Sequence, residues 1–336
     1  MPDAARGPGP GPRVALAVLG AGAWGTVIAQ LLASNGHEVR LWARDADHVS
    51  RLTHSRASDA LASAALHAGV RPTADLYDAT DGVAAAFVAV PCRAYAELGE
   101  RLAEVGPVPA LVSCAKGFLD ATLRRPSEAL AATGGSVAAL SGPNLAGEIA
   151  LGLPAAATVA SNDEALAVSA QRWLGQARFR VYRSEDVVGV EASGALKNVI
   201  ALAAGMSDEL GLGENTHAAL LTRGLAELAR LGAALGGEER TFYGLAGIGD
   251  LIATCASPRS RNHQVGARVA RGEAIATIEA SGITAEGVPT VRHVVRYAAA
   301  HGLELPICRE VEAVIDRGKP PHDAIRDLMT RAARGE

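Results

Sequence analysis

The chain has 336 residues, of which 49% are hydrophobic and 20% charged, and its formal net charge is −4. Because this length exceeds the usual size of one hydrophobic core, we expect two domains. The weakly acidic balance gives no electrostatic reason to expect a nucleic acid or an anionic membrane as partner, and no apolar run approaches the roughly 20 residues that span a bilayer. We therefore expect small-molecule partners, no nucleic acid and no membrane insertion.

The N-terminal segment Met1–Pro12 is rich in proline and glycine and lacks the apolar core of a signal peptide. We interpret it as a disordered leader outside the fold. The four cysteines are widely spaced, without a C-x-x-C pair: Cys92, Cys114, Cys255 and Cys308. In a chain of this length that pattern favours reduced, buried thiols over disulfides or a metal site, which predicts a cytoplasmic location.

The first predicted elements are a strand, a glycine-rich turn, a helix and a second strand. The apolar run Val14–Leu19 leads into Gly20-Ala-Gly-Ala-Trp-Gly25, Thr26–Ala33 has a helical pattern, and Glu38–Trp42 reads as the second strand. These are the parts of a dinucleotide-binding βαβ unit with a G-x-G-x-x-G turn. The alternative is a glycine-rich strand-to-helix turn that binds nothing.

Each glycine of the turn has its own physical role in the dinucleotide interpretation. Gly20 permits the tight turn, Gly22 lets the backbone approach a pyrophosphate, and Gly25 lets the helix pack closely on the strand. The N-terminus of the helix supplies N–H groups to the anion. The sequence thus predicts a dinucleotide pyrophosphate at the start of the first helix.

Short apolar runs continue to alternate with helical stretches up to about residue 183. Further strands are expected at Ala84–Val90, Val108–Cys114, Val137–Leu140, Ala155–Ala160 and Phe179–Tyr182, with helices such as Arg93–Ala103 and Glu164–Leu174 between them. This alternation predicts an α/β fold, with a Rossmann-type, doubly wound and mostly parallel sheet. Ligands of such sheets bind beyond the carboxyl ends of the strands.

After about residue 184 the strand signals stop. Helices are expected at Ser184–Met206, Ala218–Leu235, Arg261–Arg271, Val288–Ala300, Glu310–Asp316 and Ala324–Ala333, with a break at Pro320-Pro321 before the last one. We therefore expect a dinucleotide-binding domain at residues 13–183 and an all-helical substrate domain at residues 184–336.

Two charges are isolated in otherwise uncharged segments. Lys197 is the only charged residue in 192–207, and Asp250 is the only one in 241–258. Because a lone buried charge needs a partner, we expect the two side chains to lie near each other at the wall of a cleft, where the lysine could act as an acid or base. A purely structural ion pair is an equal alternative, and a Lys197 side chain that reaches the surface is a weaker one.

Three other segments carry candidate ligand contacts. Lys116 follows a predicted strand, and Ser141-Gly-Pro-Asn144 lies between a strand and a helix, where its N–H groups could hold an oxyanion. Arg261 and Asn262 open a helix and suit a phosphate. The alternatives are a surface lysine, a plain capped turn and a basic first turn of a solvated helix.

The nine histidines show no H-x-x-x-H or H-E-x-x-H pair, and there is no G-x-S-x-G motif. We therefore expect no metal site and no serine nucleophile. His217, His263 and His293 are expected to be ordinary surface or packing residues.

Taken together, the motifs resemble the NAD(P)-dependent glycerol-3-phosphate dehydrogenases, in particular the bacterial form, over about residues 13–330. The resemblance rests on the glycine turn and on six further motifs in the same order: Cys114-Ala-Lys-Gly117, Ser141-Gly-Pro-Asn144, Gly194-Ala-Leu-Lys-Asn-Val-Ile200, Leu221-Thr-Arg-Gly-Leu-Ala-Glu227, Leu245-Ala-Gly-Ile-Gly-Asp-Leu251 and Ser260-Arg-Asn262. It implies reversible hydride transfer between a nicotinamide cofactor and dihydroxyacetone phosphate, which gives sn-glycerol 3-phosphate for phospholipid synthesis.

The resemblance also implies roles for individual residues. Lys197 would be the catalytic acid/base, with Asp250 in its polar network. The implied substrate contacts are Lys116, Gly142, Asn144, Asp250, Ser260, Arg261 and Asn262. The implied cofactor contacts are Gly20, Gly22, Ala23, Trp24, Gly25, Arg44, Lys116, Ala146, Arg261, Thr284 and Glu286. A homodimer is compatible with the resemblance, although the sequence does not fix the oligomeric state.

Two positions depart from the family pattern. Asn144 stands where many relatives carry a hydroxyl, and Ala23 stands where serine is common, so both lose a hydroxyl contact while the backbone contacts are unaffected. At the end of the second strand, Arg44 and Asp45 offer both signs of charge. An arginine there accommodates a 2′-phosphate, so we predict NADP(H), with NAD(H) as the alternative cofactor.

Two other functions compete with this one. A related dehydrogenase of 3-hydroxy acids or sugar acids would share a Rossmann domain followed by helices. A non-catalytic dinucleotide sensor would have no need for both Lys197 and Asp250.

Overall fold

The computed structural model describes residues 12–59 and 61–332, so residues 1–11 of the expected leader lie outside the described residues. The chain groups into two compact units, one made of Met1–Ala115 and Pro126–Val190, the other of Lys116–Arg125 and Glu191–Glu336. The segment 116–125 thus belongs with the helical unit, whereas the sequence interpretation placed it in the dinucleotide-binding domain. The domain boundary between residues 183 and 184 stays a prediction.

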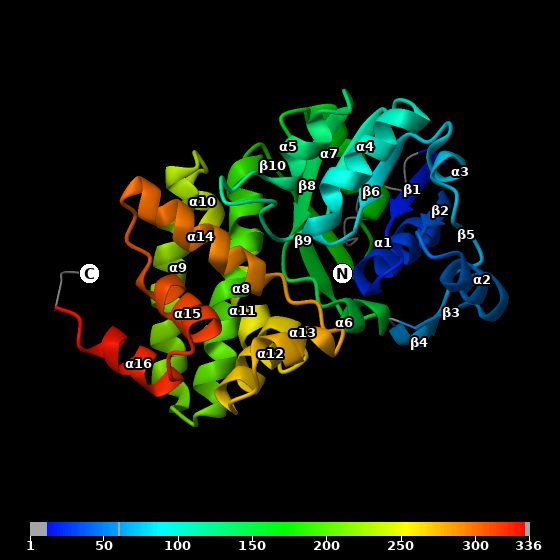
Figure 1. Cartoon of the computed structure of the whole chain (residues 1–336). Coiled ribbons are helices and arrows are strands. Elements are labelled where there is room, and N and C mark those ends of the chain that lie inside the picture. The colour runs from blue at the N-terminus through cyan, green and yellow to red at the C-terminus, as the bar shows by residue number, and fades with distance from the viewer. Residues whose placement is uncertain (1–11, 60, 333–336) are drawn as a thin grey trace, which may run out of the picture. The chain divides into compact units, whose positions relative to one another are not determined.

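The first unit is built on an eight-stranded sheet with the order β10-β9-β8-β7-β6-β1-β2-β5 (Figure 1). Every neighbouring pair is parallel except β8 and β9, which are antiparallel. The strands are β1 Ala15–Leu19, β2 Glu38–Trp42, β5 Val70–Thr73, β6 Ala85–Val88, β7 Ala110–Ser113, β8 Ser136–Ser141, β9 Ala155–Ala160 and β10 Phe179–Ser184. From β5 to β8 this is the doubly wound order 3-2-1-4-5-6, whose switch point lies between β1 and β6. The predicted fold class is confirmed.

The helices of this unit are α1 Ala23–Ser34, α2 Ala46–Ser55, α3 Leu76–Thr80, α4 Tyr95–Val105, α5 Pro126–Ala131, α6 Ala146–Ala150 and α7 Glu164–Leu174, with the 3-10 turn η1 Cys92–Ala94. An aspartate caps the N-terminus of three of them: Asp45 for α2, Asp75 for α3 and Asp163 for α7. Each carboxylate accepts hydrogen bonds from two N–H groups of the first turn, which otherwise lack a partner inside the helix.

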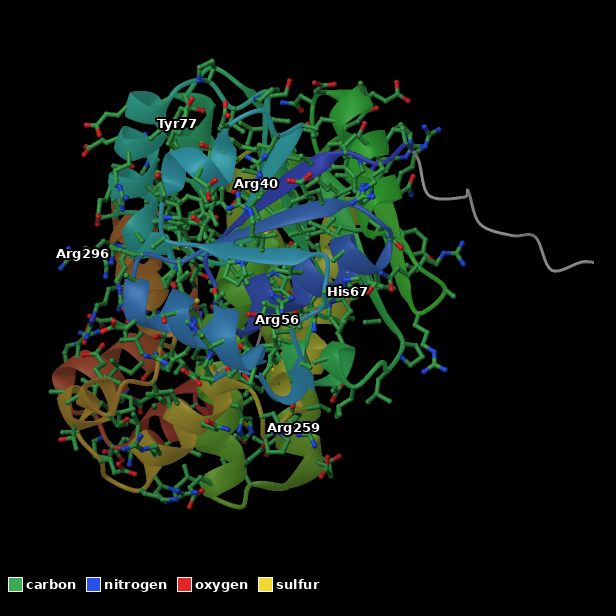
Figure 2. The ribbon with its side chains drawn as sticks, turned by 90° about the vertical axis from the view of Figure 1, so that its right-hand side faces the viewer. Arg40, Arg56, His67, Tyr77, Arg259 and Arg296 are labelled. Carbon is green, nitrogen blue, oxygen red and sulfur yellow. The ribbon has the colours of Figure 1, made fainter. Side chains whose placement is uncertain are left out.

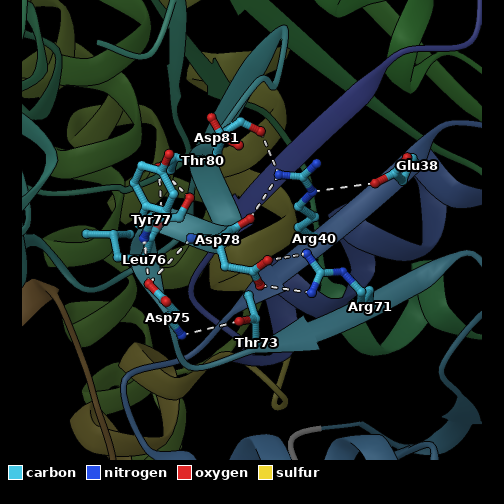
Figure 3. Close-up of polar contacts among 10 residues, drawn as sticks. All are labelled: Glu38, Arg40, Arg71, Thr73, Asp75, Leu76, Tyr77, Asp78, Thr80 and Asp81. Carbon is cyan, nitrogen blue, oxygen red and sulfur yellow. Dashed lines mark hydrogen bonds and ion pairs between the residues drawn. The ribbon is translucent and has the colours of Figure 1, made fainter. Parts of the chain in front are cut away.

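Two arginines connect the strands β2 and β5 to α3 and the residue that follows it. Arg40 of β2 donates hydrogen bonds to the carbonyl oxygens of Asp78 (2.9 Å) and Asp81 (2.6 Å), at the end of α3 (Figure 3). Arg71 of β5 forms a two-point ion pair with the Asp78 carboxylate at 2.8 and 2.9 Å. These bonds connect α3 to the strands β2 and β5 at one edge of the sheet.

The connection from α2 to β5 is held in a similar way. Arg56 ends α2 in the left-handed region with a φ of 53°, and its guanidinium donates to the carbonyl oxygens of Val70, Leu66 and His67. Figure 2 shows Arg56 and His67 on this side of the first unit, with Arg40 and Tyr77 farther up. The short pair β3 Ala57–Ser58 and β4 Leu61–Ala65 lies in this connection, and the sequence pattern did not predict it.

The second unit contains the helices α8 Val187–Glu209, α9 Gly213–Ala234, α10 Glu239–Phe242, α11 Asp250–Cys255, α12 Arg261–Ala270, α13 Ile275–Ala280, α14 Gly287–His301, α15 Pro306–Arg317 and α16 Pro321–Met329, with a π-helical turn η2 at Leu245–Gly249. Each of the six predicted helices overlaps one of these. The four short elements η2, α10, α11 and α13 were not predicted. Pro321 occupies the first turn of α16, where a missing N–H costs nothing.

The 23-residue α8 is the central helix of this unit. It is long and apolar enough to cross a membrane by length and composition, yet 83% of its most apolar window is buried inside the protein. The expectation that no apolar stretch approaches this length is therefore wrong for α8, whose apolar surface is covered by the rest of the hydrophobic core. Burial among other helices is the physical reason for its composition.

Candidate active site

The second unit brings together the two isolated charges that the sequence singled out. The ammonium nitrogen of Lys197 on α8 lies 2.7 Å from Oδ1 of Asp250, the first residue of α11. The Lys116 ammonium lies 2.6 Å from the other oxygen, Oδ2. The expected contact between Lys197 and Asp250 is confirmed, and one carboxylate holds two lysines.

The cluster is buried at its centre. The side chains of Lys197 and Asp250 are 6% and 2% exposed, which excludes a Lys197 side chain that reaches the surface. Lys116 is 17% exposed. Burial lowers the pKa of Lys197 to about 8, and the positive charge of Lys116 also lowers it, while Asp250 opposes both effects. A lysine side chain with this pKa can gain or lose a proton near neutral pH.

Thr254 is a member of the cluster that the sequence interpretation missed. Its hydroxyl lies 2.6 Å from the Lys197 ammonium and 3.2 Å from Oδ1 of Asp250. Thr254 lies four residues after Asp250, and residues at this spacing share one face of a helix. That spacing was the signal in the sequence, but it could be used only once 250–255 was known to be helical.

A chain of amides connects the cluster to two further loops. The side-chain amide of Asn198 donates to the Lys116 carbonyl oxygen at 2.9 Å and accepts from Asn262 at 2.9 Å. Asn262 in turn accepts from the N–H of Gly287 at 3.0 Å. Asn198 was also missed, although it directly follows Lys197. These bonds fix three segments that are far apart in the sequence.

The predicted residues Ser260, Arg261, Thr284 and Glu286 lie at the ends of these segments. Ser260 is buried and caps α12, where its hydroxyl accepts a hydrogen bond from the N–H of His263. Arg261 is the exposed first residue of α12. Glu286 occupies the N-cap position of α14, two residues after Thr284. The amide chain through Asn262 and Gly287 thus joins the start of α12 to the start of α14.

In the first unit, the glycine turn has the geometry that a dinucleotide requires. Gly20 has a φ of +116°, and a Cβ there would lie 2.8 Å from the Ala89 carbonyl oxygen. A Cβ on Gly25 would lie 1.8 Å from the oxygen of Gly20. Beside Gly22 there is open space, and no side chain caps the N-terminus of α1. These residues fit a pyrophosphate, since the backbone is open to an anion at a helix start.

Other predicted cofactor contacts lie beside this turn. Ala23 and Trp24 form the start of α1, and with Ala146, the first residue of α6, they pack against the core of the unit. The Trp24 ring centroid lies 6.5 Å from that of Phe179. The indole nitrogen of Trp24 is buried and has no hydrogen-bond partner in the described part of the chain.

In the predicted substrate segment at the end of β8, some polar side-chain atoms form hydrogen bonds within the protein and others do not. Gly142 has a φ of +139°, and a Cβ there would lie 3.0 Å from the Ala156 oxygen. The amide nitrogen of Asn144 donates to that same oxygen at 3.0 Å. The side-chain oxygens of Asn144 and Ser141 are buried without a protein partner in the described residues. Buried polar atoms of this kind are suited to receive a ligand or water.

The two charges after β2 have different surroundings. Asp45 accepts hydrogen bonds from the N–H groups of Asp47 (2.9 Å) and His48 (3.3 Å), so its carboxylate serves as the N-cap of α2. The Arg44 side chain is 75% exposed, with one long ion pair of 3.8 Å to Glu97. Across the described residues, 12–59 and 61–332, no group of three or more histidine, cysteine or acidic side chains is suited to hold a metal ion.

Comparison with known proteins matches both units. The model for the N-terminus of NAD-dependent glycerol-3-phosphate dehydrogenase matches residues 15–167, and the model for its C-terminus matches residues 186–326. Proteins named NAD(P)+ glycerol-3-phosphate dehydrogenase from Thermus thermophilus and Halorhodospira halophila are 47% and 43% identical to the chain. Each match covers 96% of this chain, and 99% and 98% of those two relatives.

A solved structure agrees with these matches. The crystal structure of glycerol-3-phosphate dehydrogenase from Coxiella burnetii superimposes with a TM-score of 0.90 at 35% identity, and the match covers 95% of this chain and 99% of that one. Family models, relatives and structure all span both the glycine turn and the lysine–aspartate cluster. The chain belongs to the family of NAD(P)-dependent glycerol-3-phosphate dehydrogenases, which are oxidoreductases.

Proposed function

We propose that the protein interconverts dihydroxyacetone phosphate and sn-glycerol 3-phosphate with NAD(P)H or NAD(P)+, and so supplies glycerol 3-phosphate for phospholipid synthesis. The observation that carries the proposal is the buried Lys197 ammonium, held 2.7 Å from Asp250 and 2.6 Å from Thr254. A structural ion pair needs only one cation. Here a second cation, Lys116, shares the carboxylate and lowers the pKa of Lys197 further.

The proposed mechanism follows from this arrangement. The nicotinamide, when bound, supplies the hydride for reduction and accepts it in oxidation. Protonated Lys197 donates a proton to the alkoxide oxygen that develops at C2, and neutral Lys197 takes that proton back in the reverse direction. Asp250 and Thr254 orient the Lys197 amine, because both bind its nitrogen.

We assign the substrate phosphate to the start of α12. Arg261 offers a planar fork of N–H donors, and the first turn of this ten-residue helix adds backbone N–H groups. Ser260, Asn262 and Lys116 complete the proposed substrate contacts of this unit, and Gly142 and Asn144 stay substrate contacts that the family resemblance implies. Binding energy at the phosphate would position C2 for reaction.

We further propose a preference for NADP(H). The carboxylate of Asp45 serves as a helix cap, with Oδ1 bound to two N–H groups of α2. The exposed Arg44 suits a 2′-phosphate. The other proposed cofactor contacts are those given by the family resemblance, including Ala146, Thr284 and Glu286. We also place the protein in the cytoplasm, in keeping with its four buried cysteines. We expect a homodimer, which light scattering on the purified protein would test.

An absorbance assay at the nicotinamide band tests the function. The purified protein should oxidise NADPH when dihydroxyacetone phosphate is added, and Lys197→Met should fold normally but lose at least about a thousandfold in turnover, because proton transfer and electrostatic stabilisation are both lost. Unchanged turnover in Lys197→Met would contradict the mechanism. Activity on 3-hydroxy acids without a phosphate requirement would favour the related dehydrogenases, and cofactor binding without turnover would favour a sensor.

A further inference from the structure

One carboxylate outside the lysine cluster joins three helices of the second unit. Asp208, near the end of α8, lies 2.9 Å from Nδ1 of His217 on α9 through its Oδ1. Its Oδ2 lies 2.8 Å from Nε2 of His263 on α12. Since a carboxylate only accepts hydrogen bonds, both rings donate to it. The two imidazole side chains are largely shielded from water, at 17% and 12% exposure, whereas the Asp208 side chain that joins them is 41% exposed.

His263 follows Arg261 and Asn262 directly, and it is fixed at three points. Its ring is bound by Asp208, and its backbone N–H points to the capping hydroxyl of Ser260 at 3.4 Å. Its carbonyl oxygen lies against Gly205 of α8, where an added Cβ would come within 2.0 Å. The first turn of α12 therefore has little freedom to move relative to α8.

The far end of α12 is held differently. Arg271 binds Glu209 through two hydrogen bonds of 2.8 and 2.7 Å, with side chains that are 56% and 30% exposed. Exposed pairs of this kind contribute little to stability. The neighbouring residues Asp208 and Glu209 thus bind opposite ends of the same helix, and Glu209 offers a matched control.

We propose that Asp208 is a positioning residue for phosphate recognition, which acts by holding His263, and with it Arg261 and the N–H groups of the first turn of α12, in the geometry that binds the substrate phosphate. His217 completes the bridge by fixing the second oxygen of Asp208. The proposal rests on the proposed function, because it takes the start of α12 as the phosphate site. Asp208 is not among the proposed substrate or cofactor contacts.

The test compares dihydroxyacetone phosphate with dihydroxyacetone, which lacks the phosphate. The readout is the ratio of kcat/KM for the two substrates, with NADPH saturating. Asp208→Asn should lower this ratio about tenfold through a higher KM for dihydroxyacetone phosphate, with little change in kcat, since a small displacement of a binding group weakens recognition strongly. Glu209→Gln should keep the wild-type ratio.

Two substitutions at His263 make the test independent of the folding of Asp208→Asn. In His263→Gln the amide nitrogen lies near the position of Nε2 and can still donate to Asp208, so the ratio should be retained. In His263→Asn the shorter side chain cannot reach Asp208, and the ratio should fall as in Asp208→Asn. Both substitutions remove the imidazole ring, but only His263→Gln keeps the hydrogen bond to Asp208. A difference in the kcat/KM ratio between the two variants therefore reports the effect of that hydrogen bond.

Three results would overturn the proposal. An unchanged ratio in both Asp208→Asn and His263→Asn, with a lowered ratio in Arg261→Ala, would reject the role of Asp208 and leave the phosphate site in place. Equal losses for both substrates would show that Asp208 only stabilises the fold. An unchanged ratio in Arg261→Ala would reject the phosphate site itself and the positioning role with it.

Discussion

The side chain of Lys197 shows how neighbours set the chemistry of one residue. Burial and the charge of Lys116 favour the neutral amine, whereas Asp250 favours the ammonium. The balance gives Lys197 a pKa of about 8, below the ordinary lysine value of 10.5. A lysine without these neighbours would remain protonated over the whole range in which enzymes usually work.

The pH dependence of the reaction follows from this pKa. In the proposed mechanism reduction requires protonated Lys197. We therefore expect kcat for dihydroxyacetone phosphate reduction to fall as the pH rises through about 8, and kcat for glycerol 3-phosphate oxidation to rise over the same interval. Asp250→Asn removes the group that raises the pKa of Lys197, so in the residual activity the reduction limb should move to lower pH. Measurement of kcat against pH for reduction and for oxidation, at saturating substrate, would test this shift. An unchanged pH dependence of reduction in Asp250→Asn would contradict it.

At the same scale, we expect Arg44 to set a second property, the choice of cofactor. Arg44→Ala should raise the KM for NADPH about tenfold and change that for NADH less than twofold, because only NADPH carries the 2′-phosphate. Arg51→Ala is the matched control: it removes another exposed arginine, on α2, whose partner is Asp59. Equal changes for the two cofactors in Arg44→Ala would argue against the NADP(H) preference.

At the scale of elements, close contacts between α8 and α12 depend on glycine. Gly205 of α8 faces the His263 carbonyl, and Gly266 of α12 faces the Leu202 carbonyl, where an added Cβ would in each case lie 2.0 Å from the oxygen. Both obstacles are backbone atoms, which cannot rotate away. The two helix backbones therefore approach more closely than any larger residue would allow.

We expect Gly205→Ala to lower the free energy of unfolding by about 1–3 kcal/mol, as an overpacked core does. Gly147→Ala is the control: this glycine lies inside α6 with no atom within 4 Å of an added Cβ, and alanine should be neutral or stabilising there. Urea denaturation of the two variants measures the difference. Equal stability of Gly205→Ala and wild type would show that α12 can shift without cost.

At the scale of the whole molecule, the chain forms two hydrophobic cores. A short segment that interrupts the first unit in the sequence, residues 116–125, belongs to the second core. Phe118 and Leu123 come from the segment 116–125, but both are buried in the core of the helical unit, at 3% and 2% exposure. This anchoring, together with the bond from Asn198 to the Lys116 carbonyl, holds Lys116 beside Asp250.

Phe118→Ala should therefore affect both stability and activity. Removal of a buried phenylalanine costs about 3–5 kcal/mol, and the loosened segment should displace Lys116 and lower kcat/KM at temperatures where the variant is still folded. Phe87→Ala removes an equally buried ring from the core of the first unit and should lose stability without that specific effect on Lys116. Denaturation curves and kinetics below the transition separate the two. Similar kinetic losses in both variants would contradict the anchoring role.

Much of the fold could be predicted because its signals are local. The glycine turn, the apolar strands and the helical second half follow from spacing within a few residues, and secondary structure responds to such periodicity. Short or irregular elements such as α3, α11 and the β3–β4 pair escaped prediction, since a few residues carry too little periodicity. The pairing of Lys197 with Asp250 was also predictable, because two lone buried charges need each other.

The sequence by itself determined the class of fold, the dinucleotide turn and the central ion pair. Only the tertiary structure decided that Asp45 caps α2 and that Thr254 and Asn198 join the cluster. It also decided that the segment 116–125 packs with the helical unit, and that Asp208 accepts hydrogen bonds from both His217 and His263. The physical reason is that hydrogen-bond partners depend on which surfaces pack together. In this protein, residues that lie 50 to more than 100 positions apart in the sequence form direct contacts, and no local sequence pattern predicts which of them do so.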